Sequence, residues 1–542
     1  MLSSFHTYGK RITALLTILF FMTPSCVHKS NSSDSISREI ASVPYFPTKG
    51  WKRADLKDVG MDPEKFKEFT KYVESKEYKF KTDSVVVIKD GYLVYDYYNN
   101  GYKEGQPHML WSFSKGIANA VLGAAEKKGY LHRYTKVASY YPEVAKDPRG
   151  YNMTLDHLMH MSSGLGYYEE HPKNIIFSDS IFINYSYKGY KDMALFTAQK
   201  SLLHEPGTKF NYSSGECNLA MGILKKGIAN QKEYDTFPWT GLFNKLGMSS
   251  TRLEQDAAGT FVAGSFGWSS ATDIAKLGYL YLNNGVWNGE RIFPEDWVDY
   301  SLKPAQALMN TQLVQANEMR LNQEAYGAYW WLNKKLPMNE YLPYPGTPED
   351  AFLAMGYKGQ TLAVIPSLNM IVVRLGNDGI QEETKLDRVK MLRLLVQSVN
   401  SPNPAPLIAH HSSTSAMGHG AFEFGTVTGF WKTLKAIGKN NIGLDDGFVL
   451  APAKDLCSCI FVVKQDQNFC LQNHEQYQQF RSNFWIRSLI GVGEAKIDPN
   501  KKSVTVEART HKATATYVND RLGCRVTNLR SKVRFKTLID SQ

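Results

Sequence analysis

Residues 112–129 read SFSKGIANAVLGAAEKKG and predict one helix. The apolar residues after the first turn recur at the spacing of a helix face, and Gly129 is typical of the residue that ends a helix. Residues three apart on a helix face the same side. Ser112 in the first turn and Lys115 one turn later would therefore place an ammonium nitrogen beside a hydroxyl.

This S-x-x-K pattern suggests a nucleophile and its base. A serine hydroxyl is a poor nucleophile until a base takes its proton. Burial and positive neighbours can lower the pKa of a lysine enough for the neutral amine to act as that base. Free backbone N–H groups at the helix N-terminus can also donate to an oxyanion. Ordinary capped helices carry the same pattern by chance, so the rest of the chain must support it.

The composition indicates a globular protein with more than one folded unit. The chain has 542 residues, of which 43% are hydrophobic and 21% are charged. Single cores stop growing at about 250–300 residues, so we expect at least two folded units and connecting segments. The net charge of +11 is spread thinly, without a long run of Lys or Arg, and we expect no nucleic-acid partner.

The N-terminus predicts export. Two basic residues precede an apolar run over 12–22, which has the length of a signal-peptide core and is short for a permanent membrane span. Thr23-Pro24-Ser25-Cys26 and a polar stretch follow, and the arrangement resembles a bacterial lipoprotein signal. We expect a signal peptide over 1–25, a lipid on Cys26, a polar tether over 26–50, and a periplasmic or membrane-anchored protein of the bacterial envelope. The alternative for Cys26 is an ordinary signal peptide cut nearby.

Segments near both ends of residues 51–400 predict one domain around an antiparallel sheet. We predict a helix over 63–79, a hairpin over 84–98, paired strands over 362–365 and 370–375, and a helix over 383–399. The middle, 111–302, is mostly helical in pattern. Strands at both ends with helices between them predict an α+β fold, in which a sheet made of N- and C-terminal pieces carries an inserted helical lobe.

The composition changes beyond residue 400. Proline-rich and small polar residues over 401–420 predict a linker, and residues 421–542 predict a small accessory module. Strand-like runs in this module lie at 459–463, 503–508 and 513–518.

Four of the six cysteines lie in this module, at Cys457, Cys459, Cys470 and Cys524. In an oxidising compartment they are expected to form two disulfides, with all three pairings open. Zinc is the alternative, but C-x-C with two distant single cysteines has no standard zinc spacing. Cys217 lies alone in an apolar helical context and is expected to be a buried free thiol.

Further segments follow S-x-x-K in order: TLDHLMHMSSGL (154–165), PGTKFNYSS (206–214), SSATDIA with a later NG (269–285), YGAYWW (326–331) and GYKGQ (356–360). Together they resemble the β-lactamase-related serine hydrolases, which include class C β-lactamases, D-Ala-D-Ala peptidases, EstB-like esterases and aminohexanoate-oligomer hydrolases. The resemblance covers about residues 50–400. It implies the fold of β-lactamases and penicillin-binding transpeptidases.

The resemblance implies roles for four further residues. Tyr212 falls on the tyrosine that shuttles a proton between nucleophile, lysine and leaving group. Ser214 stands where β-lactamases usually carry Asn, and is expected to hydrogen-bond a substrate amide. Gly356 and Tyr357 are placed at the oxyanion strand, where the backbone N–H groups of Ser112 and Tyr357 would hold the oxyanion.

The third motif departs from the lactamases and peptidases of the family. They carry K-T-G or H-x-G, whose cation receives the substrate carboxylate, whereas GYKGQ has no Lys or His in that place. Lys358 is near, but on a strand its side chain would point opposite to that of Tyr357. The form is more similar to the aminohexanoate-oligomer hydrolases and esterases. His157 and His160 are explained by packing and loop hydrogen bonds, and we expect no metal and no cofactor.

The sequence therefore predicts a serine hydrolase that cleaves an amide or ester in a small molecule or peptide. Ser112 would form the acyl intermediate, with Lys115 as base and Tyr212 as proton shuttle. An esterase, amidase or peptidase is favoured over a true β-lactamase. A membrane contact is expected only through a lipid on Cys26. The alternative is a catalytically silent lipoprotein of the same fold that binds or scaffolds the cell wall.

Overall fold

The computed structural model describes residues 45–169, 178–181, 191–309, 325–337, 341–379, 382–400, 447–473, 478, 494–508 and 511–531. The predicted signal peptide, Cys26, most of the predicted tether 26–50 and the predicted linker 401–420 lie outside these ranges. All of these described residues belong to one folded unit. No helix of the described residues has the length and apolarity needed to cross a membrane.

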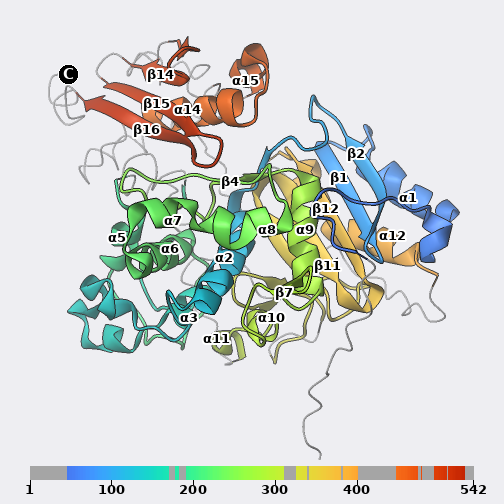
Figure 1. The fold of residues 1–542 in the computed structure, drawn as a ribbon, viewed down its shortest axis with the longest axis horizontal. Helices are drawn as coiled ribbons and strands as arrows, with labels where there is room; N and C mark the ends of the chain where they lie inside the picture. The colour runs from blue at the N-terminus through green and yellow to red at the C-terminus, as the bar shows by residue number, and fades with distance from the viewer. Residues whose placement is uncertain are drawn as a thin grey trace, which may run out of the picture. The chain divides into compact units, whose positions relative to one another are not determined.

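The main sheet has seven strands in the order β2-β1-β12-β11-β10-β9-β8 (Figure 1). Their bounds are Thr82–Lys89 (β1), Tyr92–Tyr98 (β2), Ala325–Tyr326 (β8), Trp331–Leu332 (β9), Phe352–Gly356 (β10), Gln360–Ile365 (β11) and Met370–Gly376 (β12). The N-terminal hairpin joins the C-terminal one through antiparallel pairing of β1 with β12, where Val86 lies opposite Val373. Both predicted hairpins and the predicted α+β fold are confirmed.

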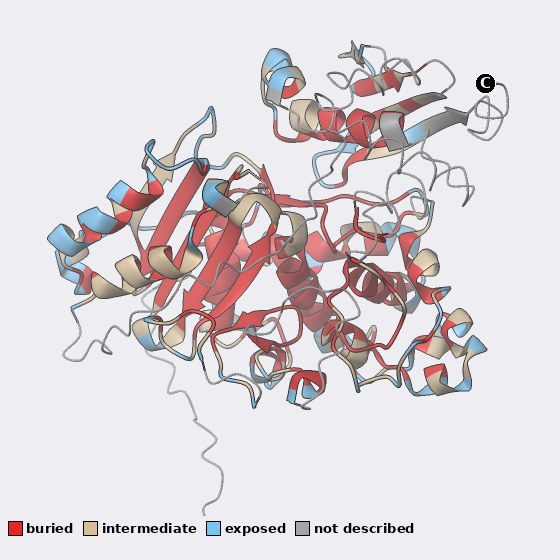
Figure 2. Cartoon of the chain, turned by 180° about the vertical axis from the view of Figure 1, so that it is seen from behind, coloured by how far each residue is buried: buried red, intermediate tan, exposed pale blue. Residues whose placement is uncertain are grey.

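Helices cover both faces of this sheet. α9 (Ala271–Leu282) packs on β11 and β12 on the face seen in Figure 1, while α1 (Pro63–Val73) and α12 (Arg388–Gln397) pack together on the opposite face (Figures 1 and 2). At Gly278 of α9, an added Cβ would lie 3.1 Å from side-chain atoms of Leu362 and Val364, so glycine permits the close approach.

The predicted helix over 63–79 is too long. α1 ends at Val73, and the Ser75 hydroxyl then accepts a hydrogen bond from the Glu77 backbone N–H at 3.1 Å. Serine side chains offer such local bonds as an alternative to the helical ladder, which is why the apolar spacing did not extend the helix.

The helical lobe is built around α2, which is buried from Ser114 to Ala125 (Figure 2). An added Cβ at Gly123 would lie 2.5 Å from the Trp297 indole nitrogen, and Gly129, with φ of 81°, ends the helix as predicted. The helices of this region are α2 (Ser114–Lys128), α3 (Leu155–Met159), α5 (Met193–Ala198), α6 (Ser214–Ile228), α7 (Gln231–Pro238), α8 (Asn244–Leu246), α10 (Trp297–Ser301) and α11 (Gln306–Met309). Short strands accompany them, namely β3 (His108–Met109), β4 (Arg252–Leu253), β5 (Gly267–Ser269), β6 (Val286–Trp287) and β7 (Glu290–Arg291).

The C-terminal module has its own antiparallel sheet in the order β13-β14-β15-β16, with α14 packed on β14, β15 and β16. Its elements are α14 (Gly447–Cys457), α15 (Gln467–Asn473), β13 (Lys496–Asp498), β14 (Ser503–Glu507), β15 (His511–Asn519) and β16 (Gly523–Ser531). The strand predicted over 459–463 is wrong, because a π-helical turn over Ser458–Val462 continues α14. A short apolar run has no periodicity that separates strand from buried helix.

The four cysteines of the module form two disulfides, as predicted. Cys457 is bonded to Cys524, which ties α14 to β16, and Cys459 is bonded to Cys470, which ties the π-helical turn to α15. Cys217 is a buried free thiol, and burial raises its pKa to about 12.

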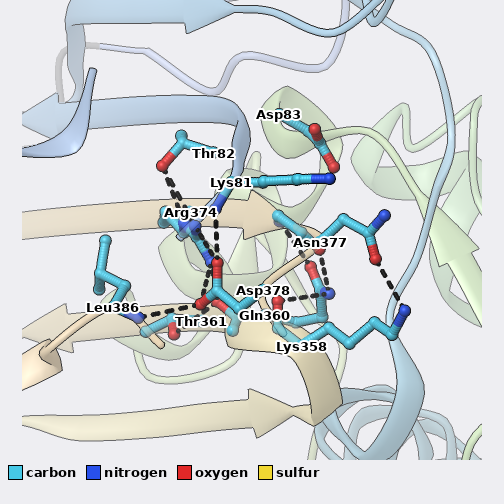
Figure 3. A network of polar contacts seen from close by, with 12 residues as sticks. Lys81, Thr82, Asp83, Lys358, Gln360, Thr361, Arg374, Asn377, Asp378 and Leu386 are labelled. Atoms are coloured by element: carbon cyan, nitrogen blue, oxygen red, sulfur yellow. Dashed lines mark hydrogen bonds and ion pairs between the residues drawn. The ribbon is translucent and has the colours of Figure 1, made fainter. Parts of the chain in front are cut away.

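A buried ion pair between Arg374 and Asp378 supports the turn between β10 and β11 (Figure 3). The Arg374 guanidinium, 0% exposed, donates to both carboxylate oxygens of Asp378 at 3.0 and 2.6 Å and to the Gly359 carbonyl at 3.1 Å. Asp378 also accepts from the backbone N–H groups of Lys81 and Leu386. The pair thus links the turn to the backbone just before β1 and to the backbone that follows β12.

Arg374→Met should lower the free energy of unfolding by about 3–5 kcal/mol, because it leaves the buried Asp378 carboxylate without its cation. Denaturant unfolding of the purified protein measures this. The control is Arg53→Met, which breaks an ion pair with Asp96 on an arginine that is 59% exposed and should cost less than about 1 kcal/mol. Equal losses in the two variants would contradict the supporting role of Arg374.

Candidate active site

Ser112 lies in a tight turn directly before α2. The turn is a 3-10 helix over Trp111–Phe113, and Trp111 has a left-handed φ of 52°, a conformation that costs energy for a bulky residue. The following Ser114 hydroxyl accepts a hydrogen bond from the Gly267 backbone N–H at 2.9 Å, which fixes the start of α2 against β5. The serine hydroxyl is therefore held at a constrained turn.

The Lys115 ammonium is buried beside Ser112. Lys115 is 1% exposed, and its Nζ donates to Ser112 Oγ at 3.1 Å, to Ser214 Oγ at 3.0 Å and to the Gly264 carbonyl at 2.8 Å. These three acceptors come from three different segments of the chain. The structure thus brings together the pair predicted from S-x-x-K and adds two oxygens that hold the lysine in place.

Tyr212 completes this cluster immediately before α6. Lys115 Nζ lies 4.7 Å from the centre of its ring, which stacks on Trp331 with ring centres 5.5 Å apart. Burial raises the pKa of the Tyr212 phenol, while the neighbouring Lys115 ammonium and the Ser112 side chain favour the phenolate. Among the described residues, the buried Tyr212 hydroxyl has no hydrogen-bond partner. The hydroxyl is therefore available to donate or to accept a proton.

Ser214 is held by a carboxylate that the sequence analysis missed. Ser214 donates its backbone N–H to Glu169 Oε2 at 2.7 Å and its hydroxyl to Glu169 Oε1 at 2.8 Å. A continuous series of hydrogen bonds therefore runs from Glu169 through Ser214 and Lys115 to Ser112. The only signal in the sequence is an acidic residue shortly after the SSGL segment, and its burial is not readable from the spacing.

Gly356 brings the end of β10 close to the Ser112 turn. A Cβ at this position would lie 2.1 Å from the Leu110 carbonyl oxygen and 3.1 Å from the Phe113 backbone nitrogen, so a larger residue would push the strand away. The Tyr357 ring meets the Trp111 ring edge-on, with ring centres 5.6 Å apart. Both segments predicted to supply oxyanion donors therefore lie side by side.

Lys358 was predicted to lie on a strand, and that prediction is wrong. It lies in a 3-10 turn over Tyr357–Gly359 with a left-handed φ of 62°, and its Nζ donates to Asn377 Oδ1 at 2.9 Å (Figure 3). Gln360 stabilises this turn, since its amide donates to the carbonyls of Tyr357 at 3.0 Å and Gly376 at 2.7 Å. The alternation of strand side chains ends at Gly356, so it could not orient Lys358.

The fold is an antiparallel sheet with an inserted helical lobe, and at the start of one helix a hydroxyl lies beside a buried ammonium. Together these features define the class of S-x-x-K serine hydrolases. A model of the Beta-lactamase family matches residues 64–395, which is more than half of the chain. The protein belongs to the Beta-lactamase family and is a serine hydrolase. In the described ranges, no three His, Cys, Asp or Glu side chains gather to hold a metal ion.

The chain is also similar to several known proteins. The 6-aminohexanoate-dimer hydrolase of Paenarthrobacter ureafaciens is 22% identical over 310 residues, which are 55% of this chain and 72% of the relative. A solved structure of an assigned beta-lactamase from Bacteroides dorei DSM 17855 matches with a TM-score of 0.50 and 15% identity, over 62% of this chain and 99% of that one. A penicillin-binding protein homologue from Caulobacter crescentus matches with a TM-score of 0.47 and 14% identity, over 62% and 99%. At its identity, the likeness to the Bacteroides dorei structure shows the fold alone.

Glu169→Gln should lower kcat/KM by about tenfold, because one of the two donors of Ser214 loses its acceptor and Lys115 loses a fixed partner. Initial rates on a p-nitrophenyl ester measure this, with circular dichroism to verify folding. The matched control is Glu205→Gln, whose side chain is 52% exposed and which should retain the wild-type rate. Wild-type kcat/KM in Glu169→Gln would show that the carboxylate does not order the site.

Proposed function

We propose that the protein hydrolyses an amide or ester through an acyl-Ser112 intermediate. The observation that carries this proposal is the buried Lys115 side chain, whose Nζ lies 3.1 Å from the Ser112 hydroxyl and is fixed by two further oxygens. A base must lie within hydrogen-bond reach of the proton that it takes, and this pair meets that condition without substrate.

Once the Lys115 ammonium has lost its proton, the neutral amine takes the Ser112 proton while Oγ attacks the carbonyl carbon. The backbone N–H groups of Ser112 and Tyr357 stabilise the oxyanion, since the close approach at Gly356 places both segments together. The tetrahedral intermediate then expels an amine or alkoxide, which takes a proton through Tyr212, and the acyl group stays on Ser112. Water attacks this ester as the Lys115–Tyr212 pair takes its proton, and the pair passes that proton to Ser112 Oγ as the acid leaves, which restores the free serine.

The substrate class is proposed from the third motif and from the relatives. The GYKGQ segment has no Lys or His where the lactamases and peptidases of the resemblance carry a cation, and Lys358 is bonded to Asn377. A relative is named for the hydrolysis of a linear amide, the 6-aminohexanoate dimer. Linear amides and esters are therefore favoured over β-lactams, in agreement with the sequence analysis.

Intact-mass analysis after treatment with a fluorophosphonate should show one adduct on the wild-type protein and none on Ser112→Ala, because only an activated serine reacts. Lys115→Met should react at least about a hundredfold more slowly, since its base is gone. Ser139→Ala serves as the control and should be labelled like wild type. Equal labelling of Ser112→Ala would overturn the proposed nucleophile, and no labelling with no ester turnover would favour the catalytically silent lipoprotein.

We also propose that the protein is exported and anchored to the envelope membrane through a lipid on Cys26. The apolar run over 12–22 followed by a cysteine and a polar tether supports this. Cys26→Ser should move the protein from the membrane fraction to the soluble fraction of its host and abolish incorporation of a labelled fatty acid. Cys217→Ser, which alters a buried thiol, should leave both unchanged. Membrane recovery of Cys26→Ser would exclude the anchor.

A further inference from the structure

Residues 262–268, the segment that enters β5, contact the helix of the nucleophile at two points. The Gly264 carbonyl accepts a hydrogen bond from Lys115 Nζ at 2.8 Å. Three residues later, the Gly267 backbone N–H donates to the Ser114 hydroxyl at 2.9 Å. The position of this segment therefore decides where the buried lysine is held relative to the start of α2.

Glu254 binds the same segment through its backbone and its side chain. Its backbone N–H donates to the Phe266 carbonyl at 3.1 Å, and its own carbonyl accepts from the Val262 backbone N–H at 2.9 Å. Its carboxylate accepts from the Trp268 indole N–H at 2.8 Å. Glu254 is fully buried, and a buried carboxylate is costly unless donors or a cation replace its water. The course of the segment thus depends on whatever stabilises this carboxylate.

The cation for Glu254 comes from the C-terminal module. The Lys454 ammonium, on α14, forms an ion pair with the Glu254 carboxylate, and the two side chains are 1% and 0% exposed. Lys454 Nζ also lies 4.0 Å from the centre of the Phe266 ring and 5.8 Å from the centre of the Trp268 ring. Cations are attracted to the faces of aromatic rings at such distances. One ammonium of the module therefore contacts the carboxylate and two rings of the segment 262–268.

Neutral donors of the module complete the contact. Glu254 accepts from the Ser458 hydroxyl at 2.8 Å and from the Cys524 backbone N–H at 2.9 Å. These groups hold the carboxyl but give it no positive charge. In the part of the chain that the structure describes, Lys454 is the only cation that pairs with Glu254.

We propose that Lys454 is a positioning residue for the reaction at Ser112, supplied by the C-terminal module. It holds the segment 262–268 through Glu254, and the Gly264 carbonyl of that segment keeps Lys115 Nζ beside the Ser112 hydroxyl. A displacement of a catalytic group by about 1 Å can cost about a hundredfold in rate, so a residue that fixes the base affects catalysis without touching substrate. This inference rests on the proposed function at Ser112, and it makes the module a part of the catalytic unit.

The test measures acylation alone, as release of p-nitrophenol from p-nitrophenyl acetate with the enzyme in excess. Lys454→Met should lower the maximal rate about tenfold, because the base is no longer held in place. The enzyme concentration at half-maximal rate should change by less than about twofold, since Lys454 does not bind the ester. Lys496→Met, which removes an ammonium of the same module that is 74% exposed, is the control and should keep the wild-type rate. A loss of folded protein would not imitate this result, because the maximal rate of the active fraction is independent of its amount.

A second readout separates action through Lys115 from a general disturbance of the site. In a Lys115→Met background, Lys454→Met should change the acylation rate by less than about twofold, because the base that it positions is already absent. An equal tenfold loss in both backgrounds would overturn the inference, and so would a wild-type rate in Lys454→Met alone.

A double variant keeps the test decisive where Lys454→Met does not fold, since that change leaves a buried carboxylate without its cation. Adding Glu254→Gln removes the second charge and keeps an oxygen that can accept from Trp268. This double variant should fold, as circular dichroism would verify, and should acylate about tenfold more slowly than wild type. A wild-type rate in it would overturn the role of Lys454 alone. Release of p-nitrophenol by the wild-type protein no faster than by Ser112→Ala would instead overturn the proposed function.

Discussion

The buried ammonium of Lys115 is the interaction on which the site depends. A cation in a protein interior is tolerated only when polar groups replace its hydration, and here three oxygens and the face of the Tyr212 ring do so. Each oxygen belongs to a different segment, namely the Ser112 turn, the start of α6 and the Gly264 loop. The requirement to satisfy one charge therefore fixes the relative positions of the helical lobe and the nucleophile. The Glu169 carboxylate extends the arrangement, since it accepts two hydrogen bonds from Ser214, and the Ser214 oxygen in turn accepts from Lys115.

A second constraint is the close approach of the sheet to the Ser112 turn. It depends on the missing side chain of Gly356 and is maintained from behind by Gln360 and by the Arg374–Asp378 pair. The left-handed conformation of Trp111 is strained, and it persists because α2 and β10 hold the turn from both sides. The ion pair that stabilises the fold and the backbone that would bind the oxyanion thus belong to one connected structure. Loss of the pair would therefore remove one of the hydrogen bonds that support the turn.

The sequence predicted those parts of the fold that depend on local pattern. The helix after Ser112, its end at Gly129 and both hairpins follow from apolar spacing and turn residues, and the structure contains them. The course of residues 459–463 was not predictable, because a short apolar run suits a buried strand and a buried helical turn equally. Lys358 was misplaced for another reason, since the rule for alternating side chains holds only as far as the strand continues. Glu169 escaped notice because burial of a carboxylate is a property of the folded neighbourhood and leaves no mark in residue spacing.

The C-terminal module and the hydrolase domain form one energetic unit. A small sheet with one covering helix buries little apolar surface by itself, and modules of this size are commonly stapled by disulfides. Here the bonds from Cys457 to Cys524 and from Cys459 to Cys470 supply the staples, while the apolar face of α14 is completed by residues of the hydrolase domain. Glu254 is central to this arrangement, because it is buried in the hydrolase domain and its hydrogen bonds end on α14, the π-helical turn and β16. Separating the module would leave that carboxylate and the apolar cluster uncovered at once, so the contact is costly to open.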